Sequence, residues 1–297
     1  MRKNIPSLTS LLLNRYGKYG TQIQEIENIS NYLGKILSEN ESFLDENFLS
    51  RLVSNSEFDN RMAELYFISA LRSNCFSLEH KSNEGLDIWI NDISGWGEFV
   101  CAHNTPEMKK NSEVNEIRRV NNNDTLLRIT TVLKSKSDII KRNLAKGLIH
   151  ENEPVVLFLS TSLLIDPFPM NPEGDVCSFA RSLFPISEPV VYVNVNTGEG
   201  KMGRNYQYGI PKKDVIVEND FFLNETNSLI SAVVFSYCSI FYRYDHPTSL
   251  FKDGDDFIIF HNPLAKNPIQ HGLMKCWQEY VCEYEKDASF TIRNIKA

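Results

Sequence analysis

The stretch from Glu57 to Cys75 constrains the fold more than any other part of this sequence, because its apolar residues cover nearly the whole circumference of a helix. These residues are Phe58, Met62, Leu65, Tyr66, Phe67, Ile68 and Leu71. A helix that is apolar on almost every side has to be covered by other elements. We therefore predict that it lies buried against a sheet.

The segments that follow this helix supply such a sheet. Runs rich in β-branched and aromatic residues, separated by polar turns, predict strands over Phe76–His80, Leu86–Ile90 and Trp96–Ala102. A helix is expected over Thr125–Lys146, with Asp124 as its cap and Gly147 as its end. Pro154–Ser160 has the apolar composition of a central strand. The order from about Glu57 to about Leu159 is therefore αβββαβ, which predicts an α/β fold with a mixed central sheet.

The flanking segments differ in character from this core, which we place at residues 56–160. Residues 1–55 form an N-terminal helical extension, with helices predicted over Ile23–Leu37 and Phe43–Val53. Residues 161–297 form a β-rich extension packed on the same sheet, and a separate second domain is the weaker alternative. Its expected elements are strands over Pro189–Val195, Ser231–Arg243 and Asp256–His261, a Gly-rich loop over Gly198–Gly203, and a last helix around Gly272–Glu285.

Composition limits the classes of protein that the chain can belong to. Its 297 residues are 42% apolar and 23% charged, which allows a substantial core and excludes a disordered protein. No run approaches the ~20 apolar residues of a membrane helix, and no signal peptide is predicted. The six cysteines have no C-x-x-C spacing, so we interpret them as reduced, buried and structural, as in a cytoplasmic protein, and structural zinc is not predicted.

Charge is distributed unevenly along the chain. The net charge of −7 argues against a protein that binds nucleic acid over its whole surface. Between Lys109 and Lys146, however, ten basic residues stand against four acidic ones, an excess of +6 that leaves −13 for the remainder. This basic strip is compatible with a surface that faces phosphates. A solvated helix face, with its bases placed favourably for the helix dipole, explains it equally well.

Acidic residues converge on the predicted hairpin. Because side chains alternate along a strand, Asp87 and Trp89 share one face, as do Trp96, Glu98 and Val100. If Asn91 pairs with Trp96, Asp87 and Glu98 are diagonal neighbours roughly 7–8 Å apart at Cα. Two such carboxylates can share a hard divalent cation.

Glu64 adds a third acid, on an apolar part of the buried helix. A buried carboxylate without a partner costs several kcal/mol. It therefore needs a metal, backbone donors or a structural base, and Arg61 and Arg72 are the nearest candidates for that base.

These elements resemble the PD-(D/E)XK superfamily of restriction-endonuclease-like nucleases. Glu64, Gly85-Leu86-Asp87 and Trp96-Gly97-Glu98-Phe99-Val100, followed by a long helix and a strand, carry the resemblance. A poorly characterised bacterial group within that pattern is more similar still, through Arg128-Ile129-Thr130-Thr131 and Lys136. The resemblance covers about a hundred residues. It implies Mg²⁺ or Mn²⁺ bound by Glu64, Asp87 and Glu98, and hydrolysis of DNA or RNA.

The chain departs from the superfamily at Val100, where a catalytic Lys is usual. Lys136 is the substitute that the helix pattern suggests, because it lies beside the apolar stripe where an apolar residue is expected. A Lys that snorkels at the edge of that stripe is the alternative. His103 and Asn104, just past the strand, are weaker substitutes.

Two hypotheses for function follow. The first is a cytoplasmic, divalent-metal-dependent nuclease whose catalytic residues are Glu64, Asp87, Glu98 and Lys136. The second is a catalytically silent protein of the same fold that acts as a binding module. Contacts with nucleic acid are expected from Lys109, Lys110, Arg128 and Lys134, and a homodimer is left open. His261 and Asn262, at a strand end, could bind a ligand but more often satisfy their own turn.

Overall fold

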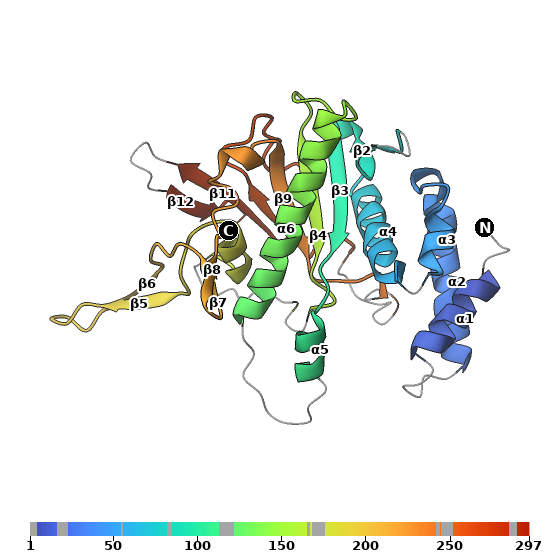
Figure 1. The fold of residues 1–297 in the computed structure, drawn as a ribbon, viewed down its shortest axis with the longest axis horizontal. Coiled ribbons are helices and arrows are strands. Elements are labelled where there is room, and N and C mark those ends of the chain that lie inside the picture. The colour runs from blue at the N-terminus through green and yellow to red at the C-terminus, as the bar shows by residue number, and fades with distance from the viewer. Residues whose placement is uncertain are drawn as a thin grey trace.

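The central element of the structure is an eight-stranded mixed sheet with the strand order β1-β2-β3-β4-β9-β10-β11-β12 (Figure 1). The computed structural model describes residues 5–16, 23–54, 56–81, 85–112, 122–164, 167, 176–241, 244, 252–284 and 290–296. The strands of the sheet are β1 (Leu78–Glu79), β2 (Ile88–Ile90), β3 (Gly95–Cys101), β4 (Val155–Ser160), β9 (Ile230–Ser236), β10 (Ile258–His261), β11 (Gln278–Tyr284) and β12 (Phe290–Asn294). β3, β4 and β9 run parallel, as do β10 and β11, whereas the other neighbours are antiparallel. The predicted α/β class with a mixed central sheet is confirmed.

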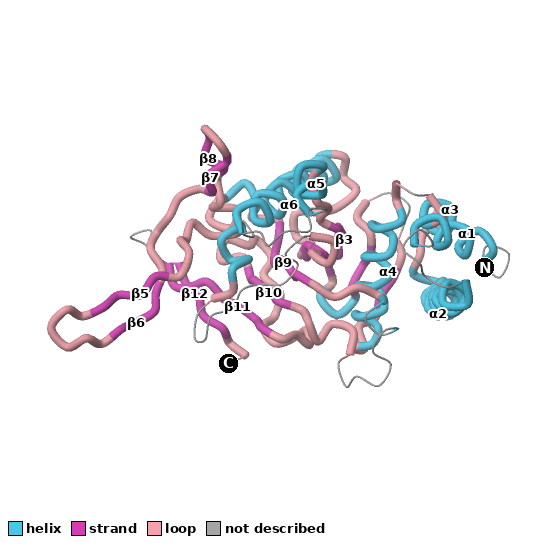
Figure 2. Tube along the Cα trace, turned by 90° about the horizontal axis from the view of Figure 1, so that it is seen from below, coloured by secondary structure: helices cyan, strands magenta, loops and turns pink. Residues whose placement is uncertain are grey.

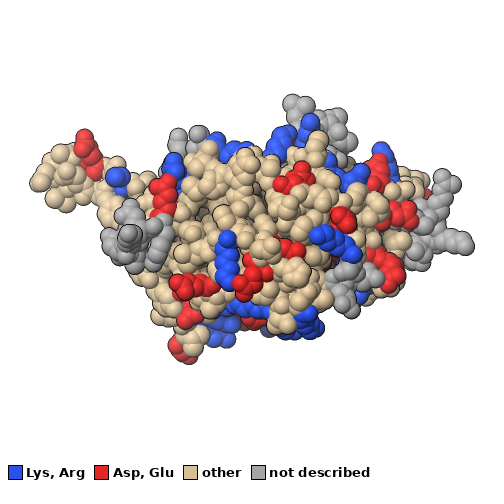
Figure 3. Space-filling view, turned by 90° about the horizontal axis from the view of Figure 1, so that it is seen from above, with Lys and Arg blue, Asp and Glu red and all other residues tan. Residues whose placement is uncertain are grey.

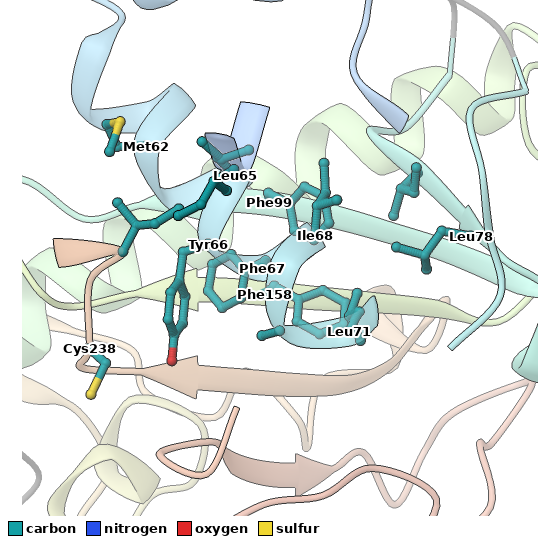
Figure 4. Close-up of a cluster of buried hydrophobic side chains, with 14 of the residues drawn as sticks. Met62, Leu65, Tyr66, Phe67, Ile68, Leu71, Leu78, Phe99, Phe158 and Cys238 are labelled. Carbon is teal, nitrogen blue, oxygen red and sulfur yellow. The ribbon is translucent and has the colours of Figure 1, made fainter. Parts of the chain in front are cut away.

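Helix α4 (Phe58–Ser73) covers one face of this sheet and is buried along most of its length, as its composition predicts. Figure 4 shows its side chains directed at the strands. The ring of Phe67 lies 5.6 Å from that of Phe99 on β3 and 5.5 Å from that of Phe158 on β4, centroid to centroid. Aromatic contacts of this kind anchor the helix to the centre of the sheet.

Helix α6 (Asn122–Ala145) covers the opposite face. Side chains of β4 alternate accordingly: Val156 and Phe158 belong to the α4 side and Leu157 to the α6 side. α6 begins two residues before Asp124, which therefore lies in the first turn and is not the cap. Gly147 ends the helix as predicted, with φ +72° and a hydrogen bond from its N–H to the carbonyl of Leu144.

The predicted order of elements from Glu57 to Leu159 is found, with one addition. A short helix, α5 (Pro106–Ser112), precedes α6, and residues 113–121 lie outside the described part of the chain. The turn expected over Lys81–Gly85 also includes undescribed residues, at positions 82–84.

The N-terminal segment is helical, as expected, but its helices differ from the predicted ones. They are α1 (Ile5–Tyr16), α2 (Ile23–Asn40), the 3₁₀ helix η3 (Glu41–Phe43) and α3 (Phe48–Leu52). α1 was not predicted. The single helix expected over Phe43–Val53 is interrupted because the Asp45 carboxylate accepts the N–H of Asn47, a local bond that competes with helix formation.

The C-terminal segment extends the central sheet only in part. β9 and β10 join it where strands were expected, although β9 ends at Ser236 and not at the expected Arg243. β5 (Val190–Val193) does not join it. β5 pairs with β6 (Gly200–Gly203), which replaces the expected Gly-rich loop, and β7 (Ile210–Lys212) pairs with β8 (Val215–Val217). These two small sheets are separate from the large one, and β5–β6 projects from the body as an arm (Figure 2).

The prediction of a last helix around Gly272–Glu285 is wrong. Within this range, Gln278–Tyr284 forms β11, which pairs parallel with β10 and antiparallel with β12. Residues 278–281 are all buried, so the segment has no alternating polar face that would reveal a strand. The remaining 3₁₀ helices are η4 (Asn91–Ile93), η5 (Ser178–Ser182) and η6 (Glu225–Asn227).

All six cysteines are unbridged, but Cys75 is exposed, contrary to the expectation that every cysteine is buried. It follows α4 with φ +66°, in the turn that leads toward β1. Among the described residues, no helix combines the length and the hydrophobicity required to cross a membrane.

Candidate functional site

Asp87 and Glu98 face each other across the β2–β3 hairpin. Trp89 pairs with Trp96 and Ile88 with Gly97, so the next pair in this register is Asp87 with Glu98. The predicted pairing of Asn91 with Trp96 is therefore wrong, since Trp96 pairs with Trp89, two residues earlier. The register differs because the turn closes earlier, with Ile90 opposite Gly95. The two acids still share a face, as expected, but directly rather than diagonally. The Asp87 carboxylate also accepts the N–H of Phe99 at 2.6 Å.

Lys136 reaches this pair from α6. Its Nζ lies 2.5 Å from Oε1 of Glu98, and the two side chains are 18% and 6% exposed. Burial disfavours the ammonium, but Glu98 and Asp87 outweigh burial and raise the pKa of Lys136 above its ordinary value. The predicted inward orientation of Lys136 is confirmed, and it is not a snorkelling side chain.

The surroundings of Glu98 favour the neutral, protonated form of its carboxyl. Burial, followed by the negative charge of Asp87, raises its pKa to about 8, although Lys136 acts in the other direction. A carboxyl with a pKa near neutrality can exchange a proton under physiological conditions, which is the property required of a general acid or base.

Glu64 lies on the α4 side of the same group of acids and is held by Arg61. The guanidinium Nη1 of Arg61 is 2.5 Å from Oε2 of Glu64 and 3.2 Å from Oδ2 of Asp45. Burial, Asp87 and Asp45 raise the pKa of Glu64 to about 8 against the effect of Arg61. The structural base considered for Glu64 is thus Arg61, whereas Arg72 binds Asn40 instead.

A cleft opens beside these residues. Glu64, Asp87, Arg61 and Asp45 line it together with Arg51 and His80. Sequence reasoning missed Asp45 and His80, because neither is close in sequence to the acids that it joins. His80 follows β1, and the pairing of β1 with β2 brings it to the cleft, so a correct strand register would have found it.

The donor set agrees with Mg²⁺ or Mn²⁺ in chemistry but is incomplete as a cage. No group of three His, Cys, Asp or Glu side chains is arranged to hold a metal ion in the part of the chain that the structure describes. Mg²⁺ commonly uses only one or two carboxylates and completes its shell with water and substrate phosphates. Asp87 and Glu98 supply two. The negative charge of Asp87 raises the pKa of both Glu64 and Glu98, and a divalent cation bound among these acids would offset that charge.

The basic strip is less continuous than its sequence suggests. Arg128 donates from Nε to the carbonyl of His103 at 2.6 Å, and Lys134 lies 3.7 Å from a carboxylate oxygen of Glu218. Lys109 and Lys110 are exposed on α5. Positive and negative side chains are interspersed on the face seen in Figure 3. Two of the four residues predicted to contact nucleic acid, Arg128 and Lys134, therefore already have partners within the protein.

The remaining candidates make structural contacts. The His103 ring bonds to Asn60 at 3.2 Å, and Asn104 donates to the carbonyl of Leu163. Asn262 satisfies neighbouring backbone groups, as in the alternative interpretation. His261 bonds to the buried carboxylate of Glu279 at 2.8 Å. None of the four joins Asp87 and Glu98.

No protein-family model, curated protein or solved structure matches the chain. Its class is therefore an α/β protein with a mixed eight-stranded sheet and a buried acid–lysine site, and the assignment of a function depends on this geometry.

Proposed function

We propose that the chain is a divalent-cation-dependent nuclease with a PD-(D/E)XK-like core, acting on phosphodiester bonds of DNA or RNA. The observation that carries the proposal is the Lys136 ammonium on the Glu98 carboxylate, opposite Asp87. A Lys supplied by α6 would compensate for Val100, which occupies the usual lysine position on β3. The order of elements from α4 to β4 is compatible with such a core.

Each residue has a distinct part in the proposed chemistry. Asp87 and Glu98 would hold the ion, which when bound polarises a phosphodiester and lowers the pKa of an attacking water. Lys136 remains protonated and can donate to a phosphate oxygen. Glu64, with its raised pKa, can accept or return a proton near neutral pH.

A nuclease assay with Mg²⁺ or Mn²⁺ tests the proposal on single- and double-stranded DNA and RNA. Asp87→Asn, Glu98→Gln and Lys136→Met should each reduce cleavage by roughly 10²-fold or more. The ion pair of Lys35 with Glu39 on α2 is exposed and lies away from the site, so Lys35→Met and Glu39→Gln are matched controls that should retain activity.

Two results would overturn the assignment. One is the absence of metal-dependent cleavage by folded wild-type protein on all four substrates. The other is cleavage that survives both Asp87→Asn and Glu98→Gln, which would place any activity elsewhere or in a contaminant.

A catalytically silent binding module is the second candidate, and the Arg61–Glu64 ion pair favours it. Arg61 occupies Glu64 with a base where a nuclease would direct that carboxylate at a metal or a water. Calorimetric titration with Mn²⁺ separates the candidates: the nuclease requires binding that Asp87→Asn abolishes, whereas the silent module predicts none.

A further inference from the structure

The β5–β6 arm (Pro189–Gly203) concentrates exposed apolar side chains. Five of the thirteen large apolar residues that are exposed in the described chain lie on this arm: Val191, Tyr192, Val193, Val195 and Met202. Three of them form one face of the arm: Val191 is 60% exposed, Val193 59% and Met202 43%. Cross-strand pairing of Val191 with Met202 and of Val193 with Gly200 gives that face no charge. An apolar patch of this kind marks an interaction surface.

The outer edge of β5 is also open to pairing. Because Asn194 donates its N–H to the carbonyl of Glu199, Asn194 and its even-numbered neighbours direct their backbone groups at β6. The N–H and C=O groups of Val191 and Val193 consequently point away from the hairpin. No Lys, Arg, Asp or Glu lies between Pro189 and Thr197 to protect this edge, whereas such charges normally prevent strands from pairing.

We propose that β5 pairs antiparallel with β5 of a second copy of this chain, about a two-fold axis at Tyr192. Val191 of each copy would then lie opposite Val193 of the other, so all outward backbone groups of both residues are satisfied. The charge-free strand meets itself without like-charge repulsion, which pairing through β6 would incur at Lys201.

The same geometry explains why the partner is a second copy. An isolated two-stranded hairpin is marginally stable, whereas three or more strands with an apolar face are stable in water. Two arms joined at β5 make a four-stranded sheet, with Val191, Val193 and Met202 of both copies on one face. The interface is isologous, so it closes at a dimer and does not propagate. It is independent of the proposed nuclease site.

A site-directed crosslink tests the position of the proposed two-fold axis at Tyr192. Facing residues of a non-hydrogen-bonded pair have Cα atoms about 4.5 Å apart, within the range of a disulfide. Tyr192→Cys, in a Cys75→Ser background that removes the exposed native thiol, should therefore give a covalent dimer under mild oxidation. Val195→Cys is the control. Val195 is more exposed, at 92%, but its two copies would lie roughly 20 Å apart.

Sedimentation of the protein in solution supplies the second measurement. A small interface of this kind is weak, so the dimer should form on the order of 10–100 µM. Val193→Lys should weaken association about tenfold or more. Ile216→Lys is the control and should leave association unchanged, because Ile216 is at least as exposed, at 66%, but lies on β8. A monomer at ~100 µM, or equal crosslinking by Val195→Cys, would overturn the proposal.

Discussion

Glu98→Gln should flatten the dependence of folding stability on pH. In the folded protein the pKa of Glu98 is about 8, raised by burial and by Asp87 from 4.5. Between these two pKa values the folded state binds a proton that the unfolded state has released. Stability is therefore lost as pH rises through this window, and it levels off above about pH 8.

The size of the effect follows from the pKa. Each pH unit within the window changes the free energy of unfolding by about 1.4 kcal/mol for one such group. From about pH 6 to pH 8 this amounts to roughly 2 kcal/mol, because the slope falls off as pH approaches the folded pKa; Glu98 contributes it in wild type, and the glutamine variant lacks it. Glu64 contributes in the same direction, but because both acids interact with Asp87, the two effects do not add fully.

Urea unfolding at several pH values between about 6 and 9, in the presence of a chelator, measures this slope directly. Tryptophan fluorescence and far-UV circular dichroism should give the same transition. The exposed Glu39→Gln on α2 is the matched control and should retain the wild-type slope. If Glu98→Gln shows that same slope, Glu98 is not a buried carboxyl with a raised pKa, and the electrostatic account of the site fails.

Two further predictions concern the core. Asp256→Ala should lower the free energy of unfolding by roughly 3 kcal/mol or more, measured by urea denaturation. The reason is that the buried carboxylate of Asp256 accepts hydrogen bonds from Tyr66, Ser236 and two backbone N–H groups. An unchanged midpoint would contradict that network. Gly97→Ala should lower the free energy of unfolding by about 1–3 kcal/mol in the same assay, because an added Cβ would lie 2.9 Å from Ile88 and 3.2 Å from Phe158. A variant as stable as wild type would show that these side chains move aside.

Local patterns determined the order of elements from α4 to β4. The all-round apolar helix, the apolar strand at Pro154–Ser160 and the glycine after α6 each carry their signal within a few residues. Alternation along the hairpin was equally local, so the shared face of Asp87 and Glu98 was predictable even though the register was not. Lys136 was identified because a charged residue beside an apolar stripe requires a partner.

The hairpin register, the strand β11, the position of β5 and the raised pKa of Glu98 depend on the tertiary structure. The register of the hairpin depended on where its turn closed. The contact of Arg61 with Asp45 depended on how the segment before α3 lies against α4, whereas the pairing of Arg61 with Glu64 is local to α4. β11 was mistaken for a helix because a strand buried on both faces has no period of its own. β5 has the composition of an interior strand, yet nothing in its sequence predicts that it lies outside the large sheet. The partner of a strand depends on segments that are distant in the sequence. The raised pKa of Glu98 has the same origin. The acids and the lysine are local features of the sequence, but the burial that they share exists only in the assembled fold.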